Sequence, residues 1–112
     1  IELPAGLIGD ETEGEDPLEA AGRELEEETG YRAAKLESLG EYYSSPGMVS
    51  ESFTLVRASE LSKVSEGGGT DGEDITVHRV ALSALQSFLD GKRAQGMGVD
   101  VRLLMLLGPQ LI

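Results

Sequence analysis

The sequence predicts one α/β domain, because a well-capped amphipathic helix lies among extended apolar segments. The helix occupies the stretch between Asp16 and Gly30. A chain of 112 residues is long enough for one domain, and we expect a single domain over residues 1–112. Turn signals and apolar runs place the other elements as extended segments at 1–8, 53–58 and 75–82, a further one ending at 41–47, and helices at 83–89 and 101–107.

The helix between Asp16 and Gly30 has clear signals at both ends. Asp16 is a favourable N-cap, Pro17 suits the first helical position, and Glu19 resembles the second half of a capping box. Gly30 supplies a C-terminal stop. Gly22 is unusual inside a helix, where glycine costs about 1 kcal/mol relative to alanine, and it indicates close packing against that face. The apolar stripe of the helix consists of Leu18, Ala21 and Leu25.

Three glutamates, Glu24, Glu27 and Glu28, lie along one edge of the predicted helix. Like charges at i and i+4 repel one another, so we expect a positive partner. Arg23 is four residues before Glu27 and can pair with it. Magnesium binds a few carboxylates together with waters and substrate phosphates, so this edge is a candidate for half of a metal site. A solvated, glutamate-rich surface helix is the alternative, and it is favoured if the three glutamates are considered alone.

The stretch from Gly9 to Tyr31 resembles a complete Nudix box, and this favours the metal site over the surface helix. The family pattern is Gly, five residues, Glu, seven residues, Arg-Glu, an aliphatic, any residue, Glu-Glu, any residue, Gly and an apolar residue. The resemblance implies a Nudix α/β/α sandwich with a mixed β-sheet and metal-dependent hydrolysis of a nucleoside-linked diphosphate. Every position of the pattern is filled, by Gly9, Glu15, Arg23, Glu24, Leu25, Glu27, Glu28, Gly30 and Tyr31.

The resemblance also implies roles for the residues of the box. Glu24 and Glu28 are the strongest metal-ligand candidates, Glu27 contributes to the metal shell or to water handling, and Arg23 orients Glu27. Glu15 is expected to stabilise the loop and the helix. Two or three magnesium ions are expected, with manganese or zinc as possible substitutes.

The segment before the box resembles the strand and Pro-Ala-Gly turn of ADP-ribose pyrophosphatases. In that branch the alanine carbonyl reaches a metal, so Ala5 is a backbone ligand candidate, and Gly6 is expected beside the substrate. Gly6 is too far from Glu15 to be the first glycine of the box, whereas Gly9 has the required spacing. We therefore predict that the loop from Gly9 to Gly14 carries a three-residue insertion relative to that branch.

A proline downstream of the box points to the same branch. Pro46 lies fifteen residues after Tyr31, which is where ADP-ribose pyrophosphatases carry their marker proline. A Pro-Gly pair alone is an ordinary turn signal. With the box, the offset favours a substrate-binding role for Pro46 and Gly47, and it places Glu51 where the branch often has an acidic residue near the metal.

Residues 60–72 form a polar, glycine-rich segment that we expect to resist packing and to be a mobile loop. Its end resembles the loop of ADP-ribose pyrophosphatases that carries a proposed catalytic base. Glu73 is the first candidate for the general base and Asp71 the second. The alternative is that these acids only keep a flexible loop soluble.

Two helices are expected in the C-terminal part of the chain. We expect the helix at 83–89 to end at Asp90-Gly91 and the helix at 101–107 to end at Gly108-Pro109. The leucines and methionine of the second helix favour a core position over a cofactor-binding role. His78, the one histidine of the chain, is given no catalytic role.

Composition narrows the class of partner. A formal net charge of −12 argues against nonspecific nucleic-acid binding and favours cationic partners. The chain has no cysteine, which excludes disulfides and thiolate metal sites. No apolar run is long enough for a membrane span, and no signal peptide is recognisable. We therefore expect a cytoplasmic enzyme with a small nucleoside diphosphate as substrate and neither nucleic acid nor membrane as partner.

The start of the chain bears on assembly and on substrate choice. Ile1 begins inside a predicted strand, and related ADP-ribose pyrophosphatases carry an additional N-terminal sheet before this point. Because that region forms the dimer and the adenine pocket in the family, we expect a homodimer through a region missing here. The expected reaction is ADP-ribose to AMP and ribose 5-phosphate. The alternatives are another nucleotide sugar or dinucleotide, and a regulatory module that binds ADP-ribose without cleaving it.

Overall fold

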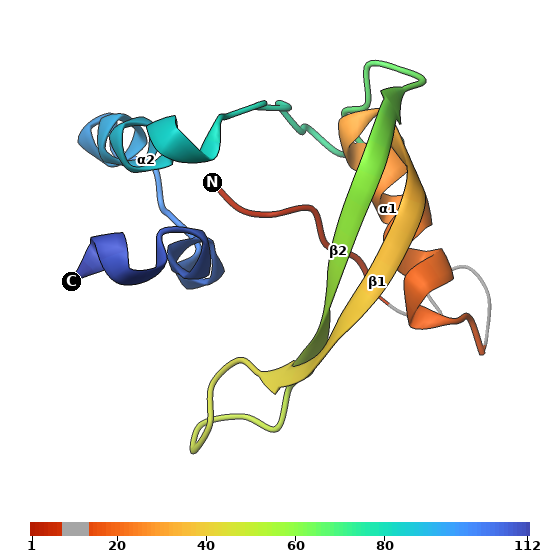
Figure 1. The fold of residues 1–112 in the computed structure, drawn as a ribbon, viewed down its shortest axis with the longest axis horizontal. Helices are drawn as coiled ribbons and strands as arrows, with labels where there is room; N and C mark the ends of the chain where they lie inside the picture. Colours follow the sequence, from red (N-terminus) through yellow and green to blue (C-terminus); the bar gives the residue numbers. More distant parts are fainter. Residues whose placement is uncertain (8–13) are drawn as a thin grey trace. The chain divides into compact units, whose positions relative to one another are not determined.

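The computed structural model describes residues 1–7 and 14–112. They form two compact units (Figure 1). One unit is Pro4–Val77, and the other combines Ile1–Leu3 with His78–Ile112. The first glycine of the predicted box, Gly9, and most of the predicted insertion lie outside the described residues.

The unit Pro4–Val77 contains one helix and a β-hairpin. Helix α1 (Pro17–Thr29) is followed directly by β1 (Tyr31–Tyr43), and a turn leads to β2 (Ser52–Lys63). The two strands pair antiparallel, and α1 packs against the hairpin, mainly on β1 (Figure 1). A register shift between Ser38 and Gly40 bends the hairpin partway along its length.

Both predicted ends of α1 are confirmed. The side chain of Asp16 accepts a hydrogen bond from the N–H of Leu18 at 2.7 Å, and Pro17 occupies the first turn. Gly30 adopts a left-handed conformation with φ 79°, and its N–H donates to the carbonyl of Glu26 at 2.9 Å. These contacts involve residues close in sequence, so the helix is defined locally at each end.

Close packing explains the glycine inside α1. A Cβ atom on Gly22 would lie 3.1 Å from Cδ1 of Leu36 on β1, so glycine allows the helix to approach the strand. The most buried residue of α1 is Ala20, with 4% of its surface exposed. The residues of the predicted apolar stripe, Leu18, Ala21 and Leu25, are half-buried.

The α/β class is confirmed, but the sheet differs from the expected mixed one. In the part of the chain that the structure describes, the sheet has two antiparallel strands, β1 and β2. The strands expected at 1–8 and 75–82 are not formed by the described residues of those segments. A strand is stabilised by ladder hydrogen bonds to a neighbour, and neither segment has one in this sheet. By contrast, the strand expected at 53–58 is confirmed within the longer β2.

The second unit is a small helical assembly. It contains α2 (Leu85–Ala94) preceded by a short 3₁₀ turn, and 3₁₀ helices at Val101–Leu106 and Gly108–Leu111. Leu103 and Leu107 confirm the core position predicted for the second C-terminal segment, whereas Met105 is exposed. The buried core residues are Leu85, Leu89, Leu103 and Leu107.

One predicted helix end is wrong in this unit. Helix α2 does not stop at Asp90-Gly91, because Gly91 is accommodated within the helix, and Gly96, with φ 87°, follows its end instead. The helix predicted at 101–107 is present as a 3₁₀ helix, Val101–Leu106. Such tighter turns are common in short pieces, and a Gly-Pro pair follows this one.

None of the helices in residues 1–7 and 14–112 combines the length and the apolar character needed to span a membrane.

Asp100 caps the 3₁₀ helix Val101–Leu106, and this cap can be tested by pH. Its carboxylate accepts from the guanidinium of Arg102 and from the N–H of the same residue, at 3.0 and 2.7 Å. These two bonds, the guanidinium first, lower the pKa of Asp100 to about 2. Because the folded pKa is lowered, the stabilisation is complete above the unfolded pKa near 3.9 and is lost as the pH falls through about 2.

We expect Asp100→Ala to lower the free energy of unfolding by about 1 kcal/mol at pH 7, the usual cost of losing a cap. The difference from the wild type should shrink at pH 3. Urea unfolding at both pH values measures it, with Asp90→Ala on α2 as the matched control. Identical urea midpoints for Asp100→Ala and the wild type at pH 7 would show that the cap contributes nothing.

Candidate active site

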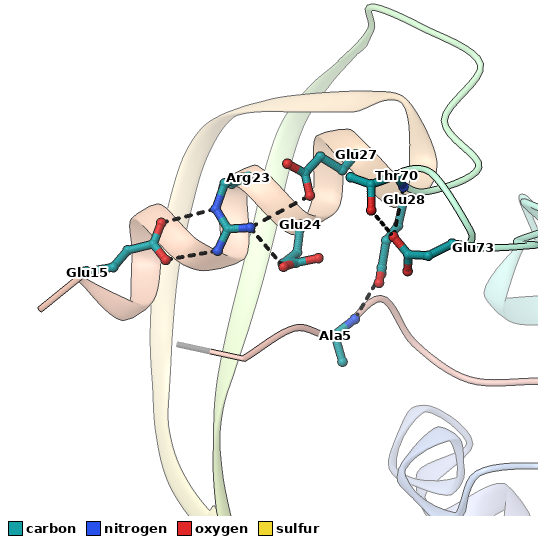
Figure 2. A network of polar contacts seen from close by, with 8 residues as sticks. All are labelled: Ala5, Glu15, Arg23, Glu24, Glu27, Glu28, Thr70 and Glu73. Carbon is teal, nitrogen blue, oxygen red and sulfur yellow. Dashed lines mark hydrogen bonds and ion pairs between the residues drawn. The ribbon is translucent and has the colours of Figure 1, made fainter. Parts of the chain in front are cut away.

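The glutamates predicted to bind metal line an open cavity of about 290 Å³ in the unit Pro4–Val77. Four of its lining residues are glutamates, and none is a lysine or arginine, so this acidic cavity favours a cation. The lining comes from the segment before α1, the exposed edge of α1 and the loop after β2 (Figure 2). The lining residues are Ala5, Gly6, Leu7, Glu24, Glu27, Glu28, Thr70 and Glu73.

Arg23 neutralises part of this charge from the side of α1. Its guanidinium donates in a fork to Glu15, from Nε to Oε2 at 3.2 Å and from Nη2 to Oε1 at 2.9 Å. The side chains are 19% and 8% exposed, so the pair is largely shielded from water. Glu15 precedes α1, and the fork therefore ties the helix to the chain that enters it, as predicted for Glu15.

The same arginine also reaches two glutamates of the acidic cavity. Nη1 lies 2.9 Å from Oε1 of Glu24 and 3.7 Å from Oε2 of Glu27 (Figure 2). The predicted pairing of Arg23 with Glu27 is thus present, but it is longer than the contacts with Glu15 and Glu24. Arg23 orients the glutamates rather than facing the cavity itself.

The chain before α1 approaches the glutamates through its backbone. The N–H of Ala5 donates to Oε2 of Glu28 at 3.1 Å. A Cβ atom on Gly6 would overlap Cγ and Cδ of Glu24, so any side chain at position 6 would displace that carboxylate. The structure brings Ala5 and Gly6 to the predicted place, whereas metal binding by the Ala5 carbonyl stays a prediction.

The glycine-rich segment docks on the C-terminal turn of α1, and the expectation that it resists packing is wrong. The N–H groups of Gly68 and Gly69 donate to the carbonyls of Glu28 and Glu27, both at 2.9 Å. These are carbonyls that the helix end leaves without intrahelical partners. Gly67 has φ 69°, and a Cβ there would lie 2.5 Å from the carbonyl carbon of Thr29. Only glycine allows the two backbones to approach so closely.

This docking brings Glu73 to the acidic cavity. Its Oε1 accepts from the N–H of Thr70 at 2.8 Å and from the hydroxyl of Thr70 at 2.7 Å. The two bonds, the backbone one first, lower the pKa of Glu73 and keep its exposed carboxylate ionised. Asp71, the second candidate for the base, does not line the cavity. Sequence analysis missed Thr70, although its position three residues before a glutamate is typical of local side-chain to backbone bonding.

The predicted substrate-binding residues Pro46, Gly47 and Glu51 are not brought to the acidic cavity. They lie in the turn between β1 and β2, where the carbonyl of Glu51 accepts from the N–H of Ser44 at 3.2 Å. β1 has 13 residues and begins directly after α1. At about 3.3 Å per residue, the turn is roughly 40 Å along the strand from the docked end of the helix.

The donor chemistry of the acidic cavity fits a hard divalent cation. Glu24, Glu27 and Glu28 offer carboxylate oxygens, the ligands that magnesium prefers. Among the described residues, no three acidic or histidine side chains converge as a ready metal cluster. Magnesium usually takes only one or two protein carboxylates and completes its shell with waters and substrate phosphates, so the donor set remains suitable.

Comparisons with known proteins agree with the box and with the geometry. The family model for the NUDIX domain matches residues 1–97. A Bacillus subtilis ADP-ribose pyrophosphatase is 42% identical over 73% of this chain and 43% of its own length. A GDP-mannose pyrophosphatase of Klebsiella pneumoniae is 35% identical over 88% of this chain and 50% of its own. An uncharacterised Nudix hydrolase of Schizosaccharomyces pombe is 36% identical over 92% and 51%. The chain thus spans about half the length of these relatives.

Two forked arginine–glutamate pairs in this unit allow the effect of burial to be measured. Arg32 pairs with Glu26 through Nε at 3.2 Å and Nη2 at 2.9 Å, as Arg23 does with Glu15. The Arg32 and Glu26 side chains are 62% and 38% exposed. The bond from Arg32 lowers the pKa of Glu26, but water screens this pair.

We expect Arg23→Ala to lower the free energy of unfolding by about 3 kcal/mol, because it removes the forked partner of the largely buried Glu15 carboxylate. Arg32→Ala is the matched control and should leave the urea midpoint close to that of the wild type. Urea unfolding followed by circular dichroism measures both variants. Equal losses would mean that burial of the Arg23 fork does not matter for stability.

Proposed function

The chain belongs to the Nudix family, and we propose that it carries the hydrolytic centre of a metal-dependent pyrophosphatase that cleaves ADP-ribose to AMP and ribose 5-phosphate. The observation that carries this proposal is the acidic cavity. There the carboxylates of the box, the backbone at Ala5 and Gly6, and the carboxylate of Glu73 meet within one compact unit. Such a cavity repels a bare diphosphate and becomes suitable for one only when cations accompany it.

Glu24 and Glu28, with the carbonyl of Ala5, would hold magnesium, and Glu27 would complete the shell or order a water. Magnesium supplies charge neutralisation on the phosphoryl oxygens and lowers the pKa of a bound water. Arg23 keeps the carboxylate of Glu24 in place from behind. The N–H of Ala5 does the same for Glu28.

Glu73 would act as the general base. The base must accept a proton from the water that attacks phosphorus, and a carboxylate that is ionised and faces the substrate can do so. Glu73 lines the acidic cavity, and its pKa is lowered by Thr70. As the water oxygen bonds to one phosphorus, the bond between that phosphorus and the bridging oxygen breaks. The other phosphate departs with the bridging oxygen.

ADP-ribose is supported by the Bacillus subtilis relative and by the offset of Pro46 from the box. GDP-mannose is the second candidate, because the Klebsiella pneumoniae relative is a GDP-mannose pyrophosphatase. The acidic cavity contacts the diphosphate that both substrates share. Residues outside it must therefore decide which nucleoside and which sugar are accepted.

The number of metal ions, the homodimer and the cytoplasmic location belong to the same proposal. The metal ions and the homodimer rest on the resemblance to ADP-ribose pyrophosphatases, and the cytoplasmic location rests on the composition of the chain.

We expect the protein with magnesium to release AMP from ADP-ribose at least ten times faster, in kcat/KM, than it hydrolyses GDP-mannose. EDTA should abolish turnover, and added magnesium or manganese should restore it, because the carboxylates alone repel the diphosphate. Chromatographic detection of nucleoside monophosphates measures both substrates. Preferential cleavage of GDP-mannose would show that the proposed substrate is wrong and that the proposed type of reaction is right. Tight binding of ADP-ribose without cleavage would favour a regulatory module.

We expect Glu28→Gln to lower kcat by at least a hundredfold while the circular dichroism spectrum stays unchanged. The amide keeps the shape of the side chain but removes the charge that would bind metal. Glu19→Gln, in the exposed first turn of the same helix, is the matched control and should keep wild-type turnover. Undiminished hydrolysis by Glu28→Gln would remove that residue from the metal site.

A further inference from the structure

We infer that Thr70 is a positioning residue, which holds the carboxylate of Glu73 in one orientation at the acidic cavity. The inference rests on the proposed function, in which Glu73 is the general base. Thr70 lines the same cavity and donates two hydrogen bonds to the carboxylate of Glu73. Its contribution is to fix where the base lies.

Thr70 and Glu73 are joined by three hydrogen bonds. The N–H of Glu73 donates to the carbonyl of Thr70 at 3.1 Å, which closes a turn of the backbone. In the opposite direction, the N–H and the hydroxyl of Thr70 both donate to Oε1 of Glu73, at 2.8 and 2.7 Å. An exposed glutamate otherwise samples many rotamers. Here both its backbone and the end of its side chain are held by the same residue.

The two Thr70 donors leave one carboxylate oxygen for chemistry. Both bonds end on Oε1, and within residues 1–7 and 14–112 no hydrogen bond to Oε2 of Glu73 is formed. A general base needs a carboxylate oxygen that can reach the attacking water. Fixing Oε1 therefore fixes the position of Oε2, the oxygen that accepts the proton.

The position of Thr70 is set in turn by α1. The two residues before it, Gly68 and Gly69, donate to the carbonyls of Glu28 and Glu27. The same residues of α1 whose side chains line the acidic cavity thus hold, through their backbone, the loop that carries the base. Figure 2 shows the last link from α1 to Glu73, the two hydrogen bonds that Thr70 donates to the carboxylate.

Removing a hydroxyl that only stabilises the loop would affect kinetics and stability differently from removing one that positions the base. Loss of loop structure would weaken substrate binding, lower the unfolding midpoint, or do both. Loss of orientation would lower kcat and leave KM unchanged, because the base acts in the transition state. The hydroxyl is also replaceable by serine, which offers the same donor on a smaller side chain.

The test compares Thr70→Val, which keeps the shape and removes the hydroxyl, with Thr70→Ser, which keeps the donor. We expect Thr70→Val to lower kcat for ADP-ribose about tenfold with KM within about twofold of the wild type. Thr70→Ser should recover kcat to within about threefold of the wild type. Thr54→Val, a half-buried threonine of β2, is the matched control and should leave kcat unchanged.

A second measurement does not depend on turnover. Three-bond NMR couplings of the Glu73 side chain should indicate one rotamer in the wild type and averaging in Thr70→Val. Averaged couplings in the wild type would overturn the inference, and so would an unchanged kcat in Thr70→Val. Absence of hydrolysis by the wild type, with Glu73 in one rotamer, would instead overturn the proposed function.

Discussion

The main-chain contact between the C-terminal turn of α1 and the glycine-rich segment determines the composition of the candidate active site. An α-helix leaves its last carbonyls without partners, and here the N–H groups of Gly68 and Gly69 satisfy those of Glu28 and Glu27. In sequence, Glu73 is separated from the glutamates of α1 by the whole hairpin, β1 and β2. With this contact, residues far apart in sequence line one cavity. The backbone needs glycine at this contact because a Cβ on Gly67 would overlap the end of the helix.

Charge imposes the second constraint. Glu24, Glu27, Glu28 and Glu73 line the acidic cavity, and the nearby cation, Arg23, divides its contacts among Glu15, Glu24 and Glu27. The contact with Glu15 is the most shielded of the three, because the Glu15 side chain is the least exposed. Much of the charge of Arg23 is therefore neutralised at the start of the helix. The cavity keeps an excess of negative charge, which favours a hard divalent cation as its chemical partner.

The sequence predicted those features of the fold that depend on contacts between residues close together in the chain. The caps at Asp16 and Gly30 involve neighbours within four residues, and both are confirmed. The close approach at Gly22 was also readable, since an unfavourable residue inside a helix indicates a packing requirement. The docking of residues 67–69 was not readable, because composition alone does not distinguish a glycine-rich segment that is mobile from one that is pressed against another backbone. The strand expected at 75–82 failed for a related reason, because pairing requires a neighbour that a single segment does not reveal.

At two positions in the unit Pro4–Val77, glycine lets the backbone come close to α1 beside the acidic cavity. Gly6 lies against Glu24, and Gly67 lies against the last turn of α1. In each case a missing side chain lets a backbone N–H or carbonyl come close to the helix that carries the glutamates. Backbone groups fix position more tightly than long polar side chains, which lose rotamer freedom on ordering. The carboxylates of the acidic cavity are therefore positioned by Arg23, by the N–H of Ala5 and by the N–H and hydroxyl of Thr70.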